Sequence, residues 1–382
     1  MNKTQEMPAP LRVCYFGTYR AEYSRNRIMI EGLRRAGVEV IECQEQLWTG
    51  IADRVETASG GWLRPGFWWR VIKAYLRLIR KHNFQEYDVM VVGYPGQLDV
   101  FLARWLSRLR RKPLVWDVFM SIYLIAVERE LDQRSSVSIR LLKWLEGRAL
   151  RLPDLLIQDT AQYVSWFQET YGISADRFRL VPTGADDRVY LPHPARRADN
   201  TFQVIYYGTF IPNHGVEQMI EAAGLLKIDP AIQFIFIGDG PEREKAQARS
   251  LELNLNNVEF IPWMDPAALV SRASQADLLL GAFGSTPQSM ITVQNKIFEG
   301  LAMGKAVVTG DSPAVREALS DREQVYLCER ANPQALAEAI RELVADASLC
   351  QSLAEKGHRA FVEKYSPASL GNQFVDHLRA LP

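Results

Sequence analysis

The sequence lacks the features of membrane-spanning and disulfide-bonded proteins. No stretch of its 382 residues approaches the roughly 20 apolar residues that a membrane-spanning helix needs. The first ten residues, MNKTQEMPAP, contain no apolar core, so we expect no signal peptide. The four cysteines lie far apart and form no CxxC pair, which argues against a disulfide framework and a zinc site. Together these absences predict a cytoplasmic protein with reduced thiols.

A nicotinamide-binding fingerprint is also missing. Leu11–Phe16 has the apolar character of a buried strand, and a glycine turn, a helix from about 24 to 36 and a second strand follow it. This order is typical of the first part of a doubly wound α/β domain. Because the turn contains no GxGxxG, a dehydrogenase is disfavoured. No dense carboxylate cluster suggests a metal ion, and we expect neither a metal nor a cofactor.

Excess charge is absent as well, because 45 basic residues balance 45 acidic ones. The balance hides an asymmetry: residues 1–190 carry 28 Lys and Arg against 22 Asp and Glu, and residues 191–382 carry 17 against 23. The basic half is the better candidate to meet an anionic surface. We expect no nucleic-acid partner. The length predicts two domains.

The segment 62–82, WLRPGFWWRVIKAYLRLIRKH, contains six Lys and Arg and no Asp or Glu. Helical spacing places its basic side chains mostly on one side and its apolar ones on the other. The basic set is Arg70, Lys73, Arg77, Arg80 and Lys81, and the apolar set is Trp68, Ile72, Tyr75, Leu76 and Ile79. Two interpretations stay open. One is a helix that binds an anionic membrane surface, and the other is a domain helix whose apolar side packs on a sheet.

The segment 278–309 carries the most specific pattern. Leu278–Ala282 is a short apolar run typical of a buried parallel strand, and Gly281 and Gly284 let the backbone approach a ligand closely. The spacing predicts a helix over Asn295–Met303, ended by Gly304.

Lys296 and Glu299 lie three residues apart, on one side of this helix near its start. A helix N-terminus with a nearby lysine suits an anion such as a diphosphate. A carboxylate one turn deeper accepts hydrogen bonds from a diol such as a ribose. The alternative is a surface helix with an ordinary Lys–Glu pair.

The motif NKIFEGLAMGKAVVTGDSPAVREAL resembles the donor-site signature of retaining glycosyltransferase family 4, and weaker similarity runs through most of the chain. The resemblance implies the GT-B fold, in which two doubly wound Rossmann-like α/β domains face each other across a cleft. It implies an acceptor-side domain over 1–190, a donor-binding domain over 200–365, and a tail over about 366–382 that crosses back to the first domain.

The resemblance also implies a reaction. A hexosyltransferase of this family moves a sugar, with retention, from a nucleotide-diphosphate sugar to an acceptor. A glycan or lipid-linked acceptor of cell-surface polysaccharide or glycolipid synthesis fits best, at the inner face of the cell membrane. The alternatives are a catalytically silent protein that binds a nucleotide sugar or a membrane, and a nucleotide-sugar epimerase.

The implied site residues follow from the motifs. The donor-binding set is Gly17, Thr18, Gly208, Thr209, His214, Gly238, Gly240, Phe283, Gly284, Asn295, Lys296 and Glu299. Lys296 and Asp117 are the candidate catalytic residues. Asp117 is the ionisable residue nearest to a loop where the family often has a histidine. Its alternative role is that of a strand-end carboxylate satisfied by backbone N–H groups.

Three departures from the family pattern stand out. No histidine follows the strand at 113–118, and Ile291 occupies the place of a first glutamate eight residues before Glu299. Phe210 and His214 stand at or near the places of an arginine and a lysine that grip the diphosphate. We therefore expect the grip to depend on Lys296 and on backbone N–H groups.

Overall fold

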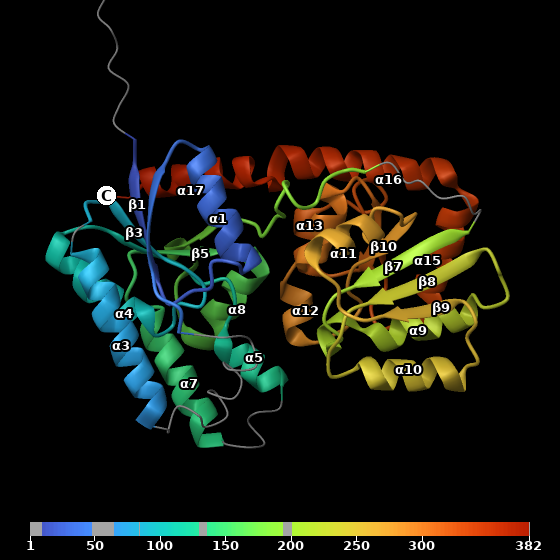
Figure 1. Ribbon diagram of the computed structural model, residues 1–382, viewed down its shortest axis with the longest axis horizontal. Helices are drawn as coiled ribbons and strands as arrows, with labels where there is room; N and C mark the ends of the chain where they lie inside the picture. Colours follow the sequence, from blue (N-terminus) through green and yellow to red (C-terminus); the bar gives the residue numbers. More distant parts are fainter. Residues whose placement is uncertain (1–9, 48–64, 84, 130–135, 194–200, 382) are drawn as a thin grey trace, which may run out of the picture. The chain divides into compact units, whose positions relative to one another are not determined.

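The computed structural model describes residues 10–47, 65–83, 85–129, 136–193 and 201–381 (Figure 1). Residues 1–9, residues 62–64 of the basic segment and residues 194–200, near the expected boundary between the two domains, lie outside this range. The chain divides into two compact units. Unit 1 combines Met1–Pro182 with Pro367–Pro382, and unit 2 is Thr183–Ser366.

Unit 1 alternates strands and helices along the chain. In order it contains β1 (Arg12–Gly17), α1 (Ser24–Arg35), β2 (Glu39–Gln44), α3 (Pro65–His82), β3 (Val89–Val92), α4 (Asp99–Arg110), β4 (Leu114–Asp117), α5 (Ile122–Glu128), α7 (Ser136–Ala149), β5 (Leu155–Gln158), α8 (Ala161–Tyr171), η2 (Ala175–Arg177), β6 (Phe178–Leu180) and, from the end of the chain, α17 (Pro367–Arg379).

The sheet of unit 1 has six strands in the order β2-β1-β3-β4-β5-β6, and its neighbours pair in parallel. Its inner strands are continuous apolar runs such as VMVV in β3, because helices cover both of their faces. The chain leaves β1 in one direction toward β2 and in the other toward β3. Ligands of such sheets lie at the carboxyl ends of the strands on either side of this reversal.

The C-terminal helix α17 belongs to unit 1, where it lies beside α1 (Figure 1). The two helices meet at glycines, since a Cβ on Gly32 would come 3.0 Å from the backbone nitrogen of Gly371. Leu370, Phe374 and Leu378 of α17 complete the apolar core on this face of the sheet.

Helix α3 packs with a stripe that the sequence did not single out. Its buried side chains are Phe67, Val71, Ala74, Leu78 and His82. On the predicted apolar side, Trp68, Ile72 and Leu76 are exposed, while Tyr75 and Ile79 are partly buried. The predicted domain-helix interpretation is therefore right that α3 packs on the unit, but wrong about which stripe packs. No helix among the described residues has the length and hydrophobicity that crossing a bilayer requires.

Unit 2 repeats the alternation. It contains β7 (Phe202–Tyr207), η3 (Pro212–His214), α9 (Val216–Leu225), β8 (Ile232–Ile237), α10 (Arg243–Glu252), β9 (Val258–Ile261), α11 (Pro266–Ala273), β10 (Leu278–Leu280), α12 (Pro287–Ile291), α13 (Asn295–Ala302), β11 (Ala306–Gly310), α14 (Pro313–Ala318), β12 (Tyr326–Cys328), α15 (Pro333–Ala345), α16 (Ala347–Ala360) and η4 (Phe361–Tyr365).

Its six strands run in the order β12-β11-β10-β7-β8-β9, again with parallel neighbours. One apolar cluster joins the sheet to α9 and α15, and another joins it to α11, α13 and α14. The reversal falls between β7 and β10, whose carboxyl ends carry Gly208 and Gly281. Helix α13 ends as predicted, with Gly304 at φ +65°.

Candidate active site

The reversal in unit 2 brings Lys296 against the end of the first strand. Gly208 follows β7 at φ +142°, and a Cβ there would lie 2.9 Å from the Lys296 ammonium nitrogen. Only glycine leaves room for the lysine at this backbone angle. The predicted helix start and the predicted glycine loop therefore meet at one point.

Lys296 is 7% exposed and Glu299 is 8% exposed, so the alternative of a surface Lys–Glu pair does not describe this helix. The Nζ of Lys296 lies 4.1 Å from the centre of the Tyr206 ring, a cation–π contact. Burial lowers the pKa of Lys296 to about 7, and the charge of Glu299 opposes this shift. The ammonium is poorly solvated, and an anion would stabilise it.

His214 is held by the loop that follows β7. Its Nδ1 lies 2.6 Å from the carbonyl oxygen of Thr209 and 2.9 Å from the hydroxyl of Tyr206. Because a carbonyl only accepts, Nδ1 carries the proton of the first bond. Burial and the nearby Lys296, whose Nζ is 3.3 Å away, lower the pKa of His214 well below its usual value. His214 is therefore neutral near pH 7 and does not supply the positive charge of the lysine it replaces.

Phe210 supplies no charge either, because it is a core residue. Its side chain is fully buried and makes an edge-to-face contact with Tyr206 at 5.5 Å between ring centres. Gly240 stands behind it at φ +151°, where a Cβ would meet the backbone nitrogen of Phe210 at 2.6 Å. Gly240 thus lets the loop after β8 pack against the backbone of the loop after β7.

Gly284 lets two loops touch. A Cβ on Gly284 would come 2.7 Å from the carbonyl oxygen of Asn213, and one on Gly215 would come 2.5 Å from the backbone nitrogen of Gly284. The amide of Phe283 donates to the carbonyl of His214 at 2.9 Å. The loops after β7 and β10 therefore form one connected backbone surface beside Lys296. Phe283 contributes its backbone, while its side chain lies in the core.

Sequence reasoning missed Arg330, which follows β12. Its Nε donates to the carbonyl of Asp311 at 2.8 Å, and one terminal nitrogen donates to the carbonyl of Gly284 at 2.7 Å. The other terminal nitrogen is buried and has no hydrogen-bond partner among the described residues. Burial lowers the pKa of Arg330 to about 10, so it stays charged near neutrality. The available signal was the short apolar run at 325–328, which ends just before this arginine.

Glu299 lies on the other side of the β7 end. Its charge is the main electrostatic reason, after burial, that the pKa of Tyr207 lies well above the usual value, and Tyr190 contributes further. Trp263, in the loop after β9, lies over Gly238, where a Cβ would come 3.0 Å from its ring. This tryptophan is 58% exposed at the carboxyl edge of the sheet.

The site residues predicted in unit 1 have internal partners. Asp117 is fully buried and forms a two-pronged ion pair with the guanidinium of Arg25 at 2.8 and 2.9 Å. Arg25 also donates to the carbonyls of Val181 and Pro182 at 2.8 Å. The geometry favours the structural alternative for Asp117, with a guanidinium in place of backbone N–H groups.

In the loop at Gly17 and Thr18, the hydrogen-bond donors already bind a carboxylate of the same unit. Asp99 accepts hydrogen bonds from the Thr18 amide at 2.6 Å and the Thr18 hydroxyl at 2.9 Å, and a third from Tyr75. Burial raises the pKa of Asp99 to about 6. These loop donors are already used within unit 1, so we do not carry Gly17 and Thr18 into the donor site.

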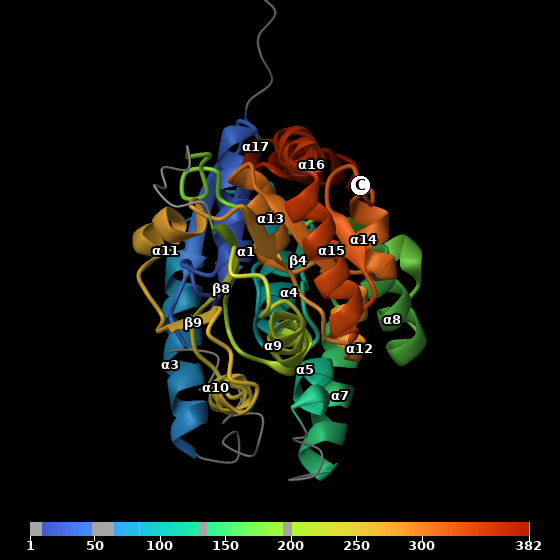
Figure 2. The same cartoon turned by 90° about the vertical axis from the view of Figure 1, so that its right-hand side faces the viewer.

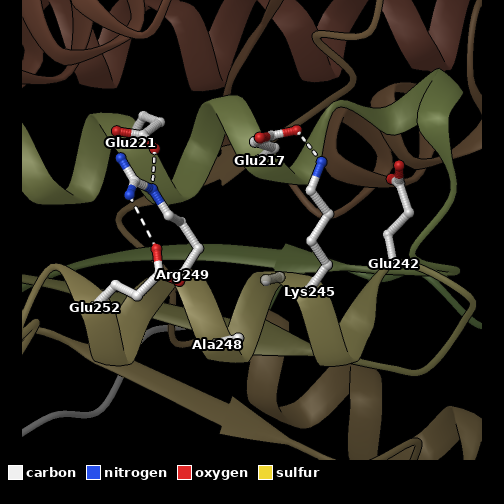
Figure 3. Close-up of a pocket in the computed structure, with 8 residues that line it drawn as sticks. Glu217, Glu221, Glu242, Lys245, Ala248, Arg249 and Glu252 are labelled. Carbon is white, nitrogen blue, oxygen red and sulfur yellow. Dashed lines mark hydrogen bonds and ion pairs between the residues drawn. The ribbon is translucent and has the colours of Figure 1, made fainter.

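A groove of about 340 Å³ lies elsewhere in unit 2, between α9 and α10 (Figure 3). Lys245 of α10 pairs with Glu217 of α9 across the groove at 2.7 Å, and Arg249 pairs with Glu252 along α10 at 3.0 Å. These are exposed ion pairs of a solvated surface, and none of the lining residues belongs to the predicted site. Among the described residues no three His, Cys, Asp or Glu side chains are grouped as a metal site would require.

Comparison with known families gives two matches that follow the two units. Residues 12–184 match the model of a glycosyl transferase 4-like domain, and residues 192–360 match the model of glycosyl transferases group 1. The two matches together indicate a GT-B glycosyltransferase.

Curated relatives of this chain carry glycosyltransferase names. The chain is 28% identical over 332 residues to a lipopolysaccharide core biosynthesis glycosyltransferase, LpsE, of Rhizobium meliloti (strain 1021), covering 84% of this chain and 90% of that protein. It is 26% identical to an alpha-D-kanosaminyltransferase of Streptomyces kanamyceticus, covering 74% of each.

Solved structures confirm the fold class. The Anabaena protein Alr3699/HepE in complex with UDP superposes with a TM-score of 0.68 at 18% identity, covering 97% of this chain and 99% of that one. Sucrose-phosphate synthase from Thermosynechococcus elongatus gives a TM-score of 0.70 at 17% identity, covering 97% and 98%. At such identities the likeness shows the GT-B fold alone.

Proposed function

We propose that this glycosyltransferase moves a sugar from a nucleotide-diphosphate sugar to a glycan or lipid-linked acceptor, and that unit 2 holds the donor. The observation that carries the proposal is Lys296. It is a desolvated ammonium at the β7–β10 reversal, beside Gly208 and the start of α13. A buried lysine without a bound anion is costly, and a diphosphate at a helix N-terminus offsets that cost.

The donor extends along the β7 end in this proposal. The diphosphate lies beside Lys296 and the α13 N-terminus, at Asn295, with the backbone of Gly208, Thr209 and Gly284 around it. The ribose hydroxyls donate to the Glu299 carboxylate, and the base lies toward Gly238 and Trp263. Structural neighbours bound to UDP and to UDP-glucose support a uridine nucleotide as the first donor to test.

In the reaction, the bond between the anomeric carbon and the diphosphate oxygen breaks while an acceptor hydroxyl bonds to the same carbon. The hydroxyl proton leaves with the diphosphate, and negative charge develops on the departing oxygen. Lys296 and the α13 N–H groups stabilise that charge. Arg330 acts on the same loop by holding the Gly284 carbonyl. We infer retention from the family resemblance and invoke no metal or cofactor.

The relatives guide the acceptor proposal. Names such as lipopolysaccharide core biosynthesis glycosyltransferase and D-inositol 3-phosphate glycosyltransferase support a saccharide or polyol acceptor in glycan or glycolipid synthesis. The protein would then act where cell-surface glycans are assembled.

A donor panel tests the proposal. Purified full-length protein is screened by thermal shift against UDP-, GDP-, ADP- and dTDP-sugars, and each hit is assayed for release of the nucleoside diphosphate with oligosaccharide and glycolipid acceptors. We expect one donor to raise the Tm and to be turned over. The Lys245→Ala variant, altered in the α9–α10 groove, serves as the matched control and should behave as wild type. Donor binding without release in any acceptor mixture would favour a catalytically silent protein, and the absence of binding would reject the donor site.

A further inference from the structure

Exposed apolar side chains concentrate on three helices of unit 1. Ten of the sixteen large apolar residues that are exposed in the described chain lie on α3, α4 and α7, which is far more than chance placement would give them. They are Trp68, Trp69, Ile72 and Leu76 on α3, Phe101, Trp105 and Leu109 on α4, and Val137, Leu141 and Trp144 on α7. We call these ten side chains the docking face. Trp69 is 69% exposed, Leu76 63% and Trp144 59%.

Folding of unit 1 does not require this face. Helix α3 already buries one stripe, in which Phe67 and Val71 pack against Leu47. Apart from the adjacent Trp68 and Trp69, the exposed residues recur every three or four positions on each helix and so form a second stripe. A helix on the surface of a soluble domain needs one apolar stripe. Right-handed crossovers place α3, α4 and α7 on the same face of the sheet, because β3, β4 and β5 follow one another in one direction. Exposed apolar stripes that gather on one face in this way mark an interaction site.

The charges of the same helices have a single sign at the surface. The three helices contain eleven Lys and Arg residues and only two carboxylates, Asp99 and Glu146. Both carboxylates are buried. Asp99 bonds to Thr18 and Tyr75, and Glu146 accepts from the hydroxyls of Ser121 and Tyr171. Glu45 and Asp154, from neighbouring segments, pair with some of the basic residues. Ordinary soluble surfaces intersperse both signs on a helix, and these helices do not.

The position of the helices shows at which edge of the sheet their exposed ends lie. Because α3 and α7 lead into the parallel strands β3 and β5, their first turns lie at the carboxyl edge of the sheet. Both helices project the same way beyond the rest of unit 1 (Figures 1 and 2). This edge is where a ligand of unit 1 would lie. The exposed tryptophans Trp68 and Trp69 stand on the projecting end of α3.

We propose that α3, α4 and α7 together dock the protein on an anionic lipid bilayer through this face. Tryptophan and leucine side chains enter the headgroup boundary, and the basic residues meet the phosphates. An acidic protein surface is the other partner that the charge would accept, but four exposed tryptophans, three of them on the projecting helices α3 and α7, fit a lipid interface better. The proposal does not rest on the proposed transfer, because lipid binding needs no donor.

Vesicle sedimentation tests the docking face with the full chain. Wild type is mixed with vesicles of pure phosphatidylcholine or of phosphatidylcholine with 30% phosphatidylglycerol, in 50 and 500 mM NaCl. We expect at least tenfold stronger partitioning onto the anionic vesicles in low salt, and loss of that excess in high salt, since the Debye length falls from more than 10 Å to a few ångström. Wild type that stays in the supernatant with anionic vesicles in low salt overturns the proposal.

Matched variants locate the contact. The apolar variant combines Trp69→Gln, Leu76→Gln and Trp144→Gln, and the charge variant combines Lys73→Glu, Arg80→Glu and Arg140→Glu. The control combines Ile228→Gln, Leu251→Gln and Lys356→Glu, which are exposed residues of unit 2. We expect both docking-face variants to lose at least tenfold in partitioning while the control matches wild type.

Two further measurements keep the result interpretable. Circular dichroism and thermal melting establish that each variant is folded, and donor binding by thermal shift reports on unit 2 independently. Equal sedimentation of wild type and both docking-face variants overturns the assignment. Vesicle-independent self-association that the apolar variant abolishes, without lipid binding by wild type, would overturn it in favour of a protein interface.

Discussion

The two units place opposite charges at the same point of the same topology. In each, the first strand ends in a glycine at a similar backbone angle, φ +138° for Gly17 and φ +142° for Gly208. In unit 1 a Cβ on this glycine would meet an oxygen of Asp99 at 2.7 Å. In unit 2 it would meet the nitrogen of Lys296 at 2.9 Å. Both charged groups are buried, and burial shifts their pKa values in opposite directions.

The difference lies in what satisfies each charge. Asp99 takes the amide and hydroxyl of Thr18, which are the donors that a phosphate would otherwise use. Lys296 faces an aromatic ring and a neutral histidine. A doubly wound sheet therefore does not by itself make an anion site. The sign of one buried side chain decides whether the glycine loop binds its own chain or is left to bind a ligand.

Removing a charge from unit 1 should cost stability. Asp117→Ala leaves Arg25 buried and unpaired, and we expect the free energy of unfolding to fall by about 3–5 kcal/mol, measured by urea denaturation. Glu86→Ala, which removes one partner of an exposed pair with Arg12, is the control and should change it by less than about 1 kcal/mol.

Asp117→Asn tests the catalytic alternative, since it keeps the shape of the side chain. Variant protein that stays folded, binds donor and fails to turn it over would restore Asp117 to a catalytic role. A change in stability with turnover retained per folded molecule would leave it as the partner of Arg25.

Removing the charge from unit 2 should cost activity instead. We expect Lys296→Ala to lower turnover at saturating donor by about 10²–10³-fold, because the lysine meets charge that develops on the leaving diphosphate. Its stability should not fall, since an unpaired buried ammonium is itself costly. Release of nucleoside diphosphate is compared with that of Lys245→Ala. Normal turnover in Lys296→Ala would break the contrast between the two units.

The local parts of this contrast were predictable and the long-range parts were not. Apolar periodicity located β10 and α13, and the GT-B fold class implied by the 295–319 motif was confirmed. Periodicity did not select the stripe of α3 that packs, because Val71 and Ile72 each belong to an apolar series with helical spacing. Asp99 and Arg330 escaped notice because their partners Thr18 and Gly284 are distant in sequence, and neither residue belongs to a motif.

Replacing the carboxylate of Glu299 should weaken donor binding without a change in fold. We expect Glu299→Gln to lower affinity for UDP by about ten- to a hundredfold, the value of one charged hydrogen bond, measured by calorimetry. The 2′-deoxy and 3′-deoxy forms of UDP sharpen the test. Wild type should lose affinity for at least one of them, and Glu299→Gln should not distinguish that one from UDP. Glu252→Gln, in the exposed groove, is the control, and unchanged UDP affinity in Glu299→Gln would remove the residue from the ribose.

The smallest effect is a pH dependence that belongs to unit 2 alone. Burial holds the pKa of Lys296 near 7 in the empty site, and a bound diphosphate raises it. Below pH 7 Lys296 is already protonated, so binding takes up no proton and the affinity should not change with pH. Above pH 7 binding adds a proton to Lys296, so the affinity should fall by up to about tenfold per pH unit. His214, whose pKa is lowered well below its usual value, stays neutral throughout.

A nucleotide sugar is the proper ligand for this measurement, because its diphosphate is esterified at both ends and keeps its charge from pH 6 to 8.5. Calorimetry in two buffers of different ionisation enthalpy should show uptake approaching one proton per site near pH 8, and Lys296→Met should abolish it. Asp99, with a pKa of about 6, is ionised throughout the range above pH 7 and adds no slope there. An equal pH dependence of affinity in wild type and Lys296→Met would assign the proton uptake to another group. Lys296 would then not be the counterpart of Asp99 that the comparison of the two units makes it.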